Sequence, residues 1–167
     1  MKLTSAEANK LLRKYAEERG ALLEKEELGR VFVAATVENK EDARPDYRYE
    51  ETRAALREIE EKIRRVKHAV NLFNVTHTLP QSGLTIDEAL VRIPQLSEEK
   101  RRLSAMRLIP EKQRAVSMRG TNLIEYTYAN FSPADAERDF NAVADELSRL
   151  QNELDLFNST AAFEIAL

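Results

Sequence analysis

The feature that most constrains this chain is a run of apolar residues, spaced three or four apart, between Tyr49 and Phe73. This spacing places the side chains on one face of an α-helix, as in a coiled coil, while charged residues fill the other faces. The same pattern returns before Phe157, 84 positions after Phe73. The first seam consists of Tyr49, Thr52, Leu56, Ile59, Ile63, Val66, Val70 and Phe73, and the second of Pro133, Ala136, Phe140, Val143, Leu147, Leu150, Leu154 and Phe157.

Two capping boxes mark the starts of two further helices. Thr4 is followed three residues later by Glu7, and Thr85 by Glu88. In such a pair the hydroxyl and the carboxylate satisfy each other's backbone N–H groups at a helix N-terminus. Each box precedes an apolar helical stripe, so a long helix is expected after each threonine.

Two short segments with β-strand character separate the helices of each pair. Residues 31–37 read Val-Phe-Val-Ala-Ala-Thr-Val, and residues 124–128 alternate apolar and polar side chains. The order helix, strand, helix therefore occurs twice, in pseudo-repeat halves at about residues 1–80 and 81–167. We expect one mainly α domain of four long antiparallel helices, with these two segments paired as a small two-stranded β-ribbon at one end.

Prolines, glycines and small polar residues indicate where helices end. Pro94 and Pro110 are expected to kink or interrupt the third helix, which Gly120 would close. Ser132 is expected to cap the fourth helix, with a proline at the favoured first position. The apolar tail, residues 161–167, is expected to pack against the rest of the chain.

The composition argues against several functional classes. The 167 residues include no cysteine, so no disulfide or thiolate nucleophile is available. Two histidines without metal-site spacing argue against a metal centre, and no cofactor motif is present. No apolar run is long enough to span a bilayer, and the net charge of −3 argues against nucleic acid as a partner. We therefore expect a cytoplasmic protein.

The ends of the two seams offer a candidate site. Both seams close in nearly the same residues, Leu-Phe-Asn-Val-Thr and Leu-Phe-Asn-Ser-Thr. In one interpretation, Asn74 and Asn158 adopt the left-handed conformation that ends helices. In the other, they join Thr76, Thr160 and Arg92 around a ligand in a polar pocket at one end of the bundle.

Other polar clusters also allow two interpretations. The basic residues within 62–67 and 100–102 could bind phosphate, but neighbouring glutamates favour ordinary pairing along a helix. Tyr126 and Tyr128 could stack on bases, but a strand with one buried face favours packing in the core.

Four stretches resemble a known family. Residues 67–76, 84–90, 125–130 and 158–160 are similar to the septicolysin-like family of small bacterial and mobile-element helical proteins of unknown function. The similarity spans most of residues 50–167, and better-known members have Asn-Trp where this chain has Asn-Ser. The resemblance implies a helical, oligomeric fold without an assigned activity.

These observations favour a non-enzymatic, self-associating helical scaffold or interaction protein. Leu11, Leu12, Leu22 and Leu23 give the first helix a wider apolar stripe than one neighbour needs, which predicts a homo-oligomer. The alternative is a protein that binds or sequesters a small ligand or nucleotide, in a pocket at a bundle end or subunit interface. An enzyme would need a convergent acid–base pair, and the sequence shows none.

Overall fold

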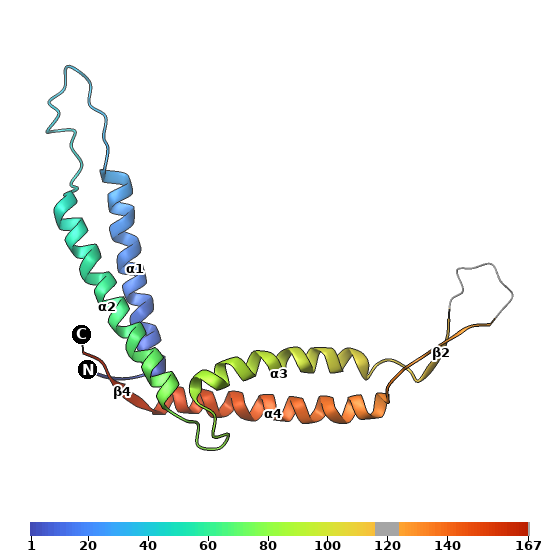
Figure 1. Cartoon of the computed structure of the whole chain (residues 1–167). Helices are drawn as coiled ribbons and strands as arrows, with labels where there is room; N and C mark the ends of the chain where they lie inside the picture. Colours follow the sequence, from blue (N-terminus) through green and yellow to red (C-terminus); the bar gives the residue numbers. More distant parts are fainter. Residues whose placement is uncertain (116–123, 167) are drawn as a thin grey trace. The chain divides into compact units, whose positions relative to one another are not determined.

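The computed structural model describes residues 1–115 and 124–166 and shows a mainly α chain with small antiparallel β-ribbons (Figure 1). This confirms the expected fold class. The helices are α1 (Ser5–Gly29), α2 (Tyr49–Thr76), α3 (Ile86–Met106) and α4 (Pro133–Thr160), and the strands are β1 (Lys2–Thr4), β2 (Lys112–Arg114), β3 (Tyr126–Tyr128) and β4 (Ala162–Glu164).

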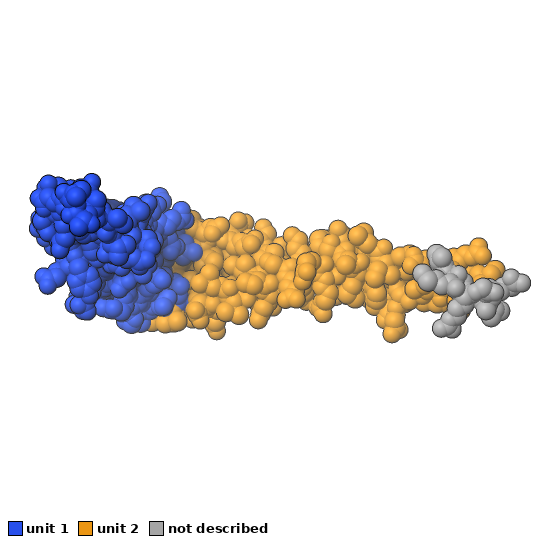
Figure 2. Space-filling view, turned by 90° about the horizontal axis from the view of Figure 1, so that it is seen from above, with its two compact units in different colours: residues 1–74, 158–167 blue, residues 75–157 orange. Residues whose placement is uncertain are grey.

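The chain forms two compact units (Figure 2). Unit 1 comprises residues 1–74 and 158–167, and it contains α1, most of α2, and the pair β1–β4. Unit 2 comprises residues 75–157, with α3, most of α4, and the pair β2–β3. Each unit is thus a pair of helices with a short two-stranded sheet.

Both predicted capping boxes are present. The N–H of Glu7 donates to the hydroxyl oxygen of Thr4 (3.2 Å), and the N–H of Thr4 donates to the Glu7 carboxylate (2.8 Å). Thr85 and Glu88 make the same two bonds, at 3.1 and 2.8 Å. Hydrogen bonds from the threonine backbone, and then from its hydroxyl, lower the pKa of each glutamate. Helices α1 and α3 therefore start in the same way.

The capping threonines also pair with extended chain from the other repeat. In unit 1, β1 and β4 are antiparallel, with Thr4 opposite Ala162. In unit 2, Thr85 forms an antiparallel bridge with Thr78. Ala162 and Thr78 each lie two residues beyond the end of a long helix, α4 and α2 respectively. The extended residues after the second helix of one repeat thus pair with the start of the first helix of the other repeat.

The seams supply the buried side of α2 and α4. Thr52, Val66 and Phe73 are buried in unit 1, and Leu147, Leu150 and Leu154 are among the buried seam residues of unit 2. The ring of Phe73 stacks on that of Phe163 in β4, with centroids 4.6 Å apart. The tail therefore packs as expected, apart from Leu167, which lies outside the described residues. The Ser132 cap is also confirmed, because its Oγ accepts the N–H of Asp135 at 3.2 Å.

The predicted ribbon between the two halves is wrong. Residues 31–37 form no strand, and the segment turns at residues 35–38, where the N–H of Glu38 donates to the carbonyl oxygen of Ala35 (3.0 Å). Strand β3 pairs instead with β2, with Gln113 opposite Thr127. These two strands are close in sequence, so closing the loop between them costs less entropy than bringing in a distant segment.

The expected interruption of the third helix at Pro110 is confirmed. Helix α3 ends at Met106, before Pro110, which disfavours helical conformation in the residue preceding it. Pro94 lies inside α3 without ending it. The expected closing residue, Gly120, lies outside the described residues. Because the helix ends at Met106, residues 112–114 are available to form strand β2.

Phe163→Ala tests the importance of the paired chain ends in unit 1. Removing this buried ring leaves Phe73 without its stacking partner, and we expect the free energy of unfolding to fall by about 3 kcal/mol. Urea unfolding followed by circular dichroism measures the change. Leu28→Ala, at an exposed position of α1, is the matched control and should change stability by less than about 0.5 kcal/mol. If Phe163→Ala and Leu28→Ala lowered the free energy of unfolding equally, the Phe163 ring would contribute little to stability.

Candidate functional site

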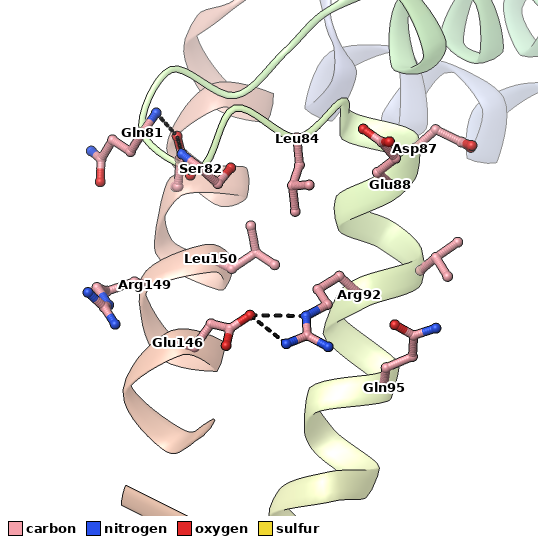
Figure 3. A pocket seen from close by; sticks show the side chains of 12 residues that line it. Gln81, Ser82, Leu84, Asp87, Glu88, Arg92, Gln95, Glu146, Arg149 and Leu150 are labelled. Carbon is pink, nitrogen blue, oxygen red and sulfur yellow. Dashed lines mark hydrogen bonds and ion pairs between the residues drawn. The ribbon is translucent and has the colours of Figure 1, made fainter. Parts of the chain in front are cut away.

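Unit 2 contains a cavity of about 710 Å³ lined by α3, α4 and the turn of residues 79–84 (Figure 3). Leu84, from the turn, and Leu150, from α4, form part of its apolar lining. Arg92 and Glu146 close one side. The cavity combines an apolar floor with a charged rim, which is the usual character of a small-ligand site.

The turn of residues 79–84 is held by its own backbone. The N–H of Leu79 donates to the carbonyl oxygen of Leu84 (2.7 Å), and the N–H of Gly83 donates to that of Leu79 (2.9 Å). Gly83 has a φ of 72°, a conformation that side-chain-bearing residues rarely adopt. The turn therefore depends on glycine at this position.

A buried carboxylate on α4 fastens this turn. Glu153 accepts the backbone N–H of Ser82 at 3.1 Å and also that of Gln81. The side chain is buried, so these donors replace the water that the carboxylate loses on folding. Glu153 thereby positions the turn that forms one wall of the cavity.

The opposite wall carries an ion pair between α3 and α4. The Nε and Nη2 atoms of Arg92 both donate to Oε1 of Glu146, at 3.0 and 2.8 Å. More than a third of each side chain is exposed, so solvent screening limits the stabilisation to at most about 1 kcal/mol. The pair nevertheless fixes how the Arg92 guanidinium faces the cavity.

The lining is more acidic than basic. Four carboxylates face two arginines; they are Asp87, Glu88, Glu146 and Glu153 against Arg92 and Arg149. Three of the four carboxylates are already engaged, in the capping box, in the ion pair and in the turn. The lowered pKa of Glu88 also makes it a weak base. This arrangement suits a neutral or cationic ligand better than a nucleotide, and it shows no acid–base pair.

The structure places the five predicted site residues as follows. Arg92 lines the cavity. Thr76 is in unit 2 but outside the cavity lining, with its hydroxyl 3.0 Å from Nδ1 of the neighbouring histidine. Asn74, Asn158 and Thr160 belong to unit 1. A pocket shared by all five residues stays a prediction.

The helix-ending interpretation of the two asparagines is wrong. Helices α2 and α4 continue for two residues beyond Asn74 and Asn158. Among the described residues, no side-chain-bearing residue has a positive φ. Helix α2 continues through Val75 and Thr76, and helix α4 through Ser159 and Thr160, because none of these residues is a glycine or proline that would end a helix.

Glu146 and Glu153, the two glutamates that shape the cavity, were not predicted from the sequence. Glu153 lies three residues after Leu150 and next to Leu154, at the edge of the second seam. Its position beside a buried apolar stripe could have indicated a structural role, because a buried carboxylate needs hydrogen-bond donors. The partners themselves are backbone groups of a distant turn, which no side-chain pattern reveals.

The basic clusters behave as ordinary helical charge pairs. Lys62 pairs with Glu58, and Arg65 with Glu61, on α2. Arg101 and Arg102 on α3 lie close to Glu98 and Glu99. These contacts confirm the expected pairing along a helix for Lys62, Arg65, Arg101 and Arg102.

Two further expectations concern membranes and metals. No helix in residues 1–115 or 124–166 carries an apolar stretch long enough to cross a membrane. In the same residues, no group of three or more histidine, aspartate or glutamate side chains is arranged to hold a metal ion.

Comparisons with known proteins support the fold but add no activity. No family model matches the chain, and no curated protein matches it. A solved structure, described as that of a functionally unknown conserved protein from Corynebacterium diphtheriae, is similar with a TM-score of 0.60. The match covers 98% of this chain and 100% of that one at 15% sequence identity, so it shows the fold alone. The septicolysin-like resemblance stays a prediction.

Glu153→Ala tests how the cavity is held. The change leaves two backbone N–H groups of the turn without their acceptor, and we expect the free energy of unfolding to fall by about 2 kcal/mol. Amide hydrogen exchange at Gln81 and Ser82 should become faster. Asp155→Ala, at an exposed position two residues further along α4, is the control and should leave the amides of Gln81 and Ser82 protected. Unchanged exchange in Glu153→Ala would contradict the assigned role.

Proposed function

We propose that this chain is a non-enzymatic helical scaffold that assembles into a homo-oligomer. The observation that carries the proposal is that both units expose large apolar side chains, among them Leu28, Val31 and Val37 in unit 1 and Leu90, Val91 and Leu108 in unit 2. Association would remove part of this apolar surface from water.

The half-buried seams support the same proposal. Leu56, Ile59 and Ile63 lie on the apolar face of α2, yet each is only partly buried. In a pair of helices each seam meets one neighbour, which leaves the flanks of its side chains accessible. Burial of apolar area stabilises by roughly 25 cal/mol per Å², so a second copy could add considerable stability.

Exposed apolar side chains are also concentrated away from the helix seams. Those between α1 and α2 are Val31, Phe32, Val33 and Val37, and those between α3 and α4 are Leu108, Ile109, Ile124, Tyr126 and Tyr128. Large exposed apolar patches mark interaction sites in soluble proteins. A scaffold role needs only such surfaces, and the engaged carboxylates of the cavity favour it over catalysis. The proposal includes a cytoplasmic location.

Sedimentation velocity and light scattering test self-association. We expect a mass above that of the monomer at micromolar concentration, rising with concentration over this range. Bovine ribonuclease A at the same concentrations serves as a monomeric control. A mass equal to one chain throughout would overturn the proposal.

The cavity of unit 2 favours a second candidate function, binding of a small cationic ligand. Its four carboxylates exceed its two arginines, and its leucines provide an apolar floor. This combination fits an alkylamine, whose charge would face the carboxylates while its methylene groups cover Leu84 and Leu150.

A thermal-shift experiment with spermidine and ATP tests this second function. We expect spermidine to raise the melting temperature and ATP to leave it unchanged. Glu146→Gln should reduce the spermidine shift because it removes a carboxylate of the lining, while Asp155→Asn, outside the cavity, should not. No shift with spermidine, or an equal shift in both variants, would exclude binding of such an amine in this cavity.

A further inference from the structure

Residues 31–34 belong to no helix or strand and pair with no strand among the described residues. Val31 is 76% exposed and Val33 94% exposed, and the side chain of Phe32 turns back toward the guanidinium of Arg44, 5.7 Å away. No β-pairing among the described residues includes this segment. Its backbone groups are therefore available to another strand.

The composition of this segment makes its exposure unusual. Residues 31–37 contain no charge, proline or glycine, and three of the seven are valine. Short segments with high β-propensity and no charge pair readily with exposed strand edges, and soluble proteins normally protect or cover them. The segment is better suited to a covered position than to an open loop.

The β2–β3 ribbon of unit 2 contains two strands, and no third strand joins either edge among the described residues. The N–H of Ala115 donates to Glu125 (2.9 Å), and the N–H of Ala129 donates to Glu111 (3.0 Å). Hydrogen-bonding direction alternates along an antiparallel strand, so the backbone groups of residues 126 and 128 point toward the open edge of β3.

One face of this ribbon carries exposed aromatic and basic side chains. In the observed register Arg114 lies opposite Tyr126 and Lys112 opposite Tyr128, which places all four on the same face. The Nζ of Lys112 lies 4.0 and 5.5 Å from the centres of the two rings. Tyr126 is 44% and Tyr128 62% exposed, so the expectation that they pack in a core is wrong.

We propose that residues 31–34 of one copy add as a third strand to the β3 edge of the ribbon in a second copy. The inference rests on the proposed self-association and names its interface. With Val31 and Val33 on the tyrosine face, the added strand would form pairs of β-branched and aromatic side chains with Tyr126 and Tyr128. Such cross-strand pairs are among the stabilising ones in sheets.

Charge complementarity favours a second copy as the occupant. Strand β2 carries Lys112 and Arg114, a charge of +2. Residues 38–42, which follow the docking segment after one turn, read Glu-Asn-Lys-Glu-Asp and carry −2. β3 lies between β2 and the added strand, and the opposite charges of the two copies favour this pairing over pairing of two ribbons, which would bring equal charges together.

This interface joins two different surfaces, so it is heterologous. Each copy offers one segment and one ribbon, and successive copies can add until a ring closes or a filament grows. The oligomer would therefore not be limited to two chains by this contact.

Lysine substitutions at two nearby valines test the segment. Val33→Lys places a positive charge against Tyr126 and Tyr128, on the face of the sheet that already carries Lys112 and Arg114, and we expect the dissociation constant for self-association to rise about tenfold or more. Val37→Lys is the matched control, because Val37 is 96% exposed but lies in the turn after the segment, and it should assemble like the unchanged protein. Sedimentation velocity measures both.

Tyrosine substitutions test the ribbon in the same way. Tyr128→Ser should weaken assembly, whereas Tyr49→Ser, at a tyrosine of similar exposure (59% against 62%), should not. If the unchanged protein assembles and all four variants assemble equally, the proposed interface is wrong while self-association stands. If the unchanged protein is a monomer, both proposals fail.

Disulfide cross-linking gives a direct readout because the chain has no cysteine. Phe32→Cys or Ala34→Cys is mixed with Thr127→Cys, since these positions would share the face opposite the tyrosines. We expect an oxidised dimer of the two different variants on a non-reducing gel. Leu28→Cys mixed with Thr127→Cys is the control and should give none.

Two outcomes of the cross-linking would overturn the interface. A disulfide between two Thr127→Cys chains in preference to the mixed pair would indicate ribbon-to-ribbon association. No disulfide in either mixture, in a protein that sediments as an oligomer, would place the interface elsewhere.

Discussion

The double role of Thr4 and Thr85 is the constraint on which the rest of the structure depends. Each side chain caps the N-terminus of a helix, while each backbone pairs with extended chain that follows a helix of the other repeat. The start of α1 or α3 is thereby tied to the residues just beyond the end of α4 or α2. With these ends fixed, the seams meet their partners along the length of each helix pair, and the turn of residues 79–84 is held where it can form a cavity wall.

The parts of the fold that the sequence predicts well are those with short-range physical causes. A capping box satisfies groups within three residues, and a seam depends on the fixed geometry of one helix. The partner of a strand depends on what the folded chain brings near it. Residues 31–37 and 126–128 both have strand character, yet only the second segment finds a partner within the described chain, because β2 is close in sequence. Pro110 was expected to interrupt the third helix, and α3 ends before it at Met106; the strand β2 that follows was not predicted, because it depends on pairing with β3.

In the candidate site, too, single residues could be predicted from the sequence, whereas their partners could not. Arg92 was predicted to join Asn74 and Asn158 around a ligand, and in the structure it lines the cavity of unit 2. The groups that define the cavity around it, the Glu146 carboxylate and the turn fastened by Glu153, come from elements brought together only by folding. The charge of the lining also depends on these other elements. Arg92 alone would favour an anionic ligand, but the surrounding carboxylates favour a neutral or cationic one.

The pairing of residues 1–4 with residues 162–165 reproduces in unit 1 a contact that a turn makes in unit 2. The N-terminal amino group of Met1 donates to the carbonyl oxygen of Ile165, and the N–H of Ile165 donates to that of Met1, both at 2.8 Å. Leu3 faces Phe163 in unit 1 as Leu84 faces Leu79 in unit 2. The same contact therefore joins segments that are far apart in sequence in one unit and the two arms of one short turn in the other, so forming it costs more loop-closure entropy in unit 1 than in unit 2.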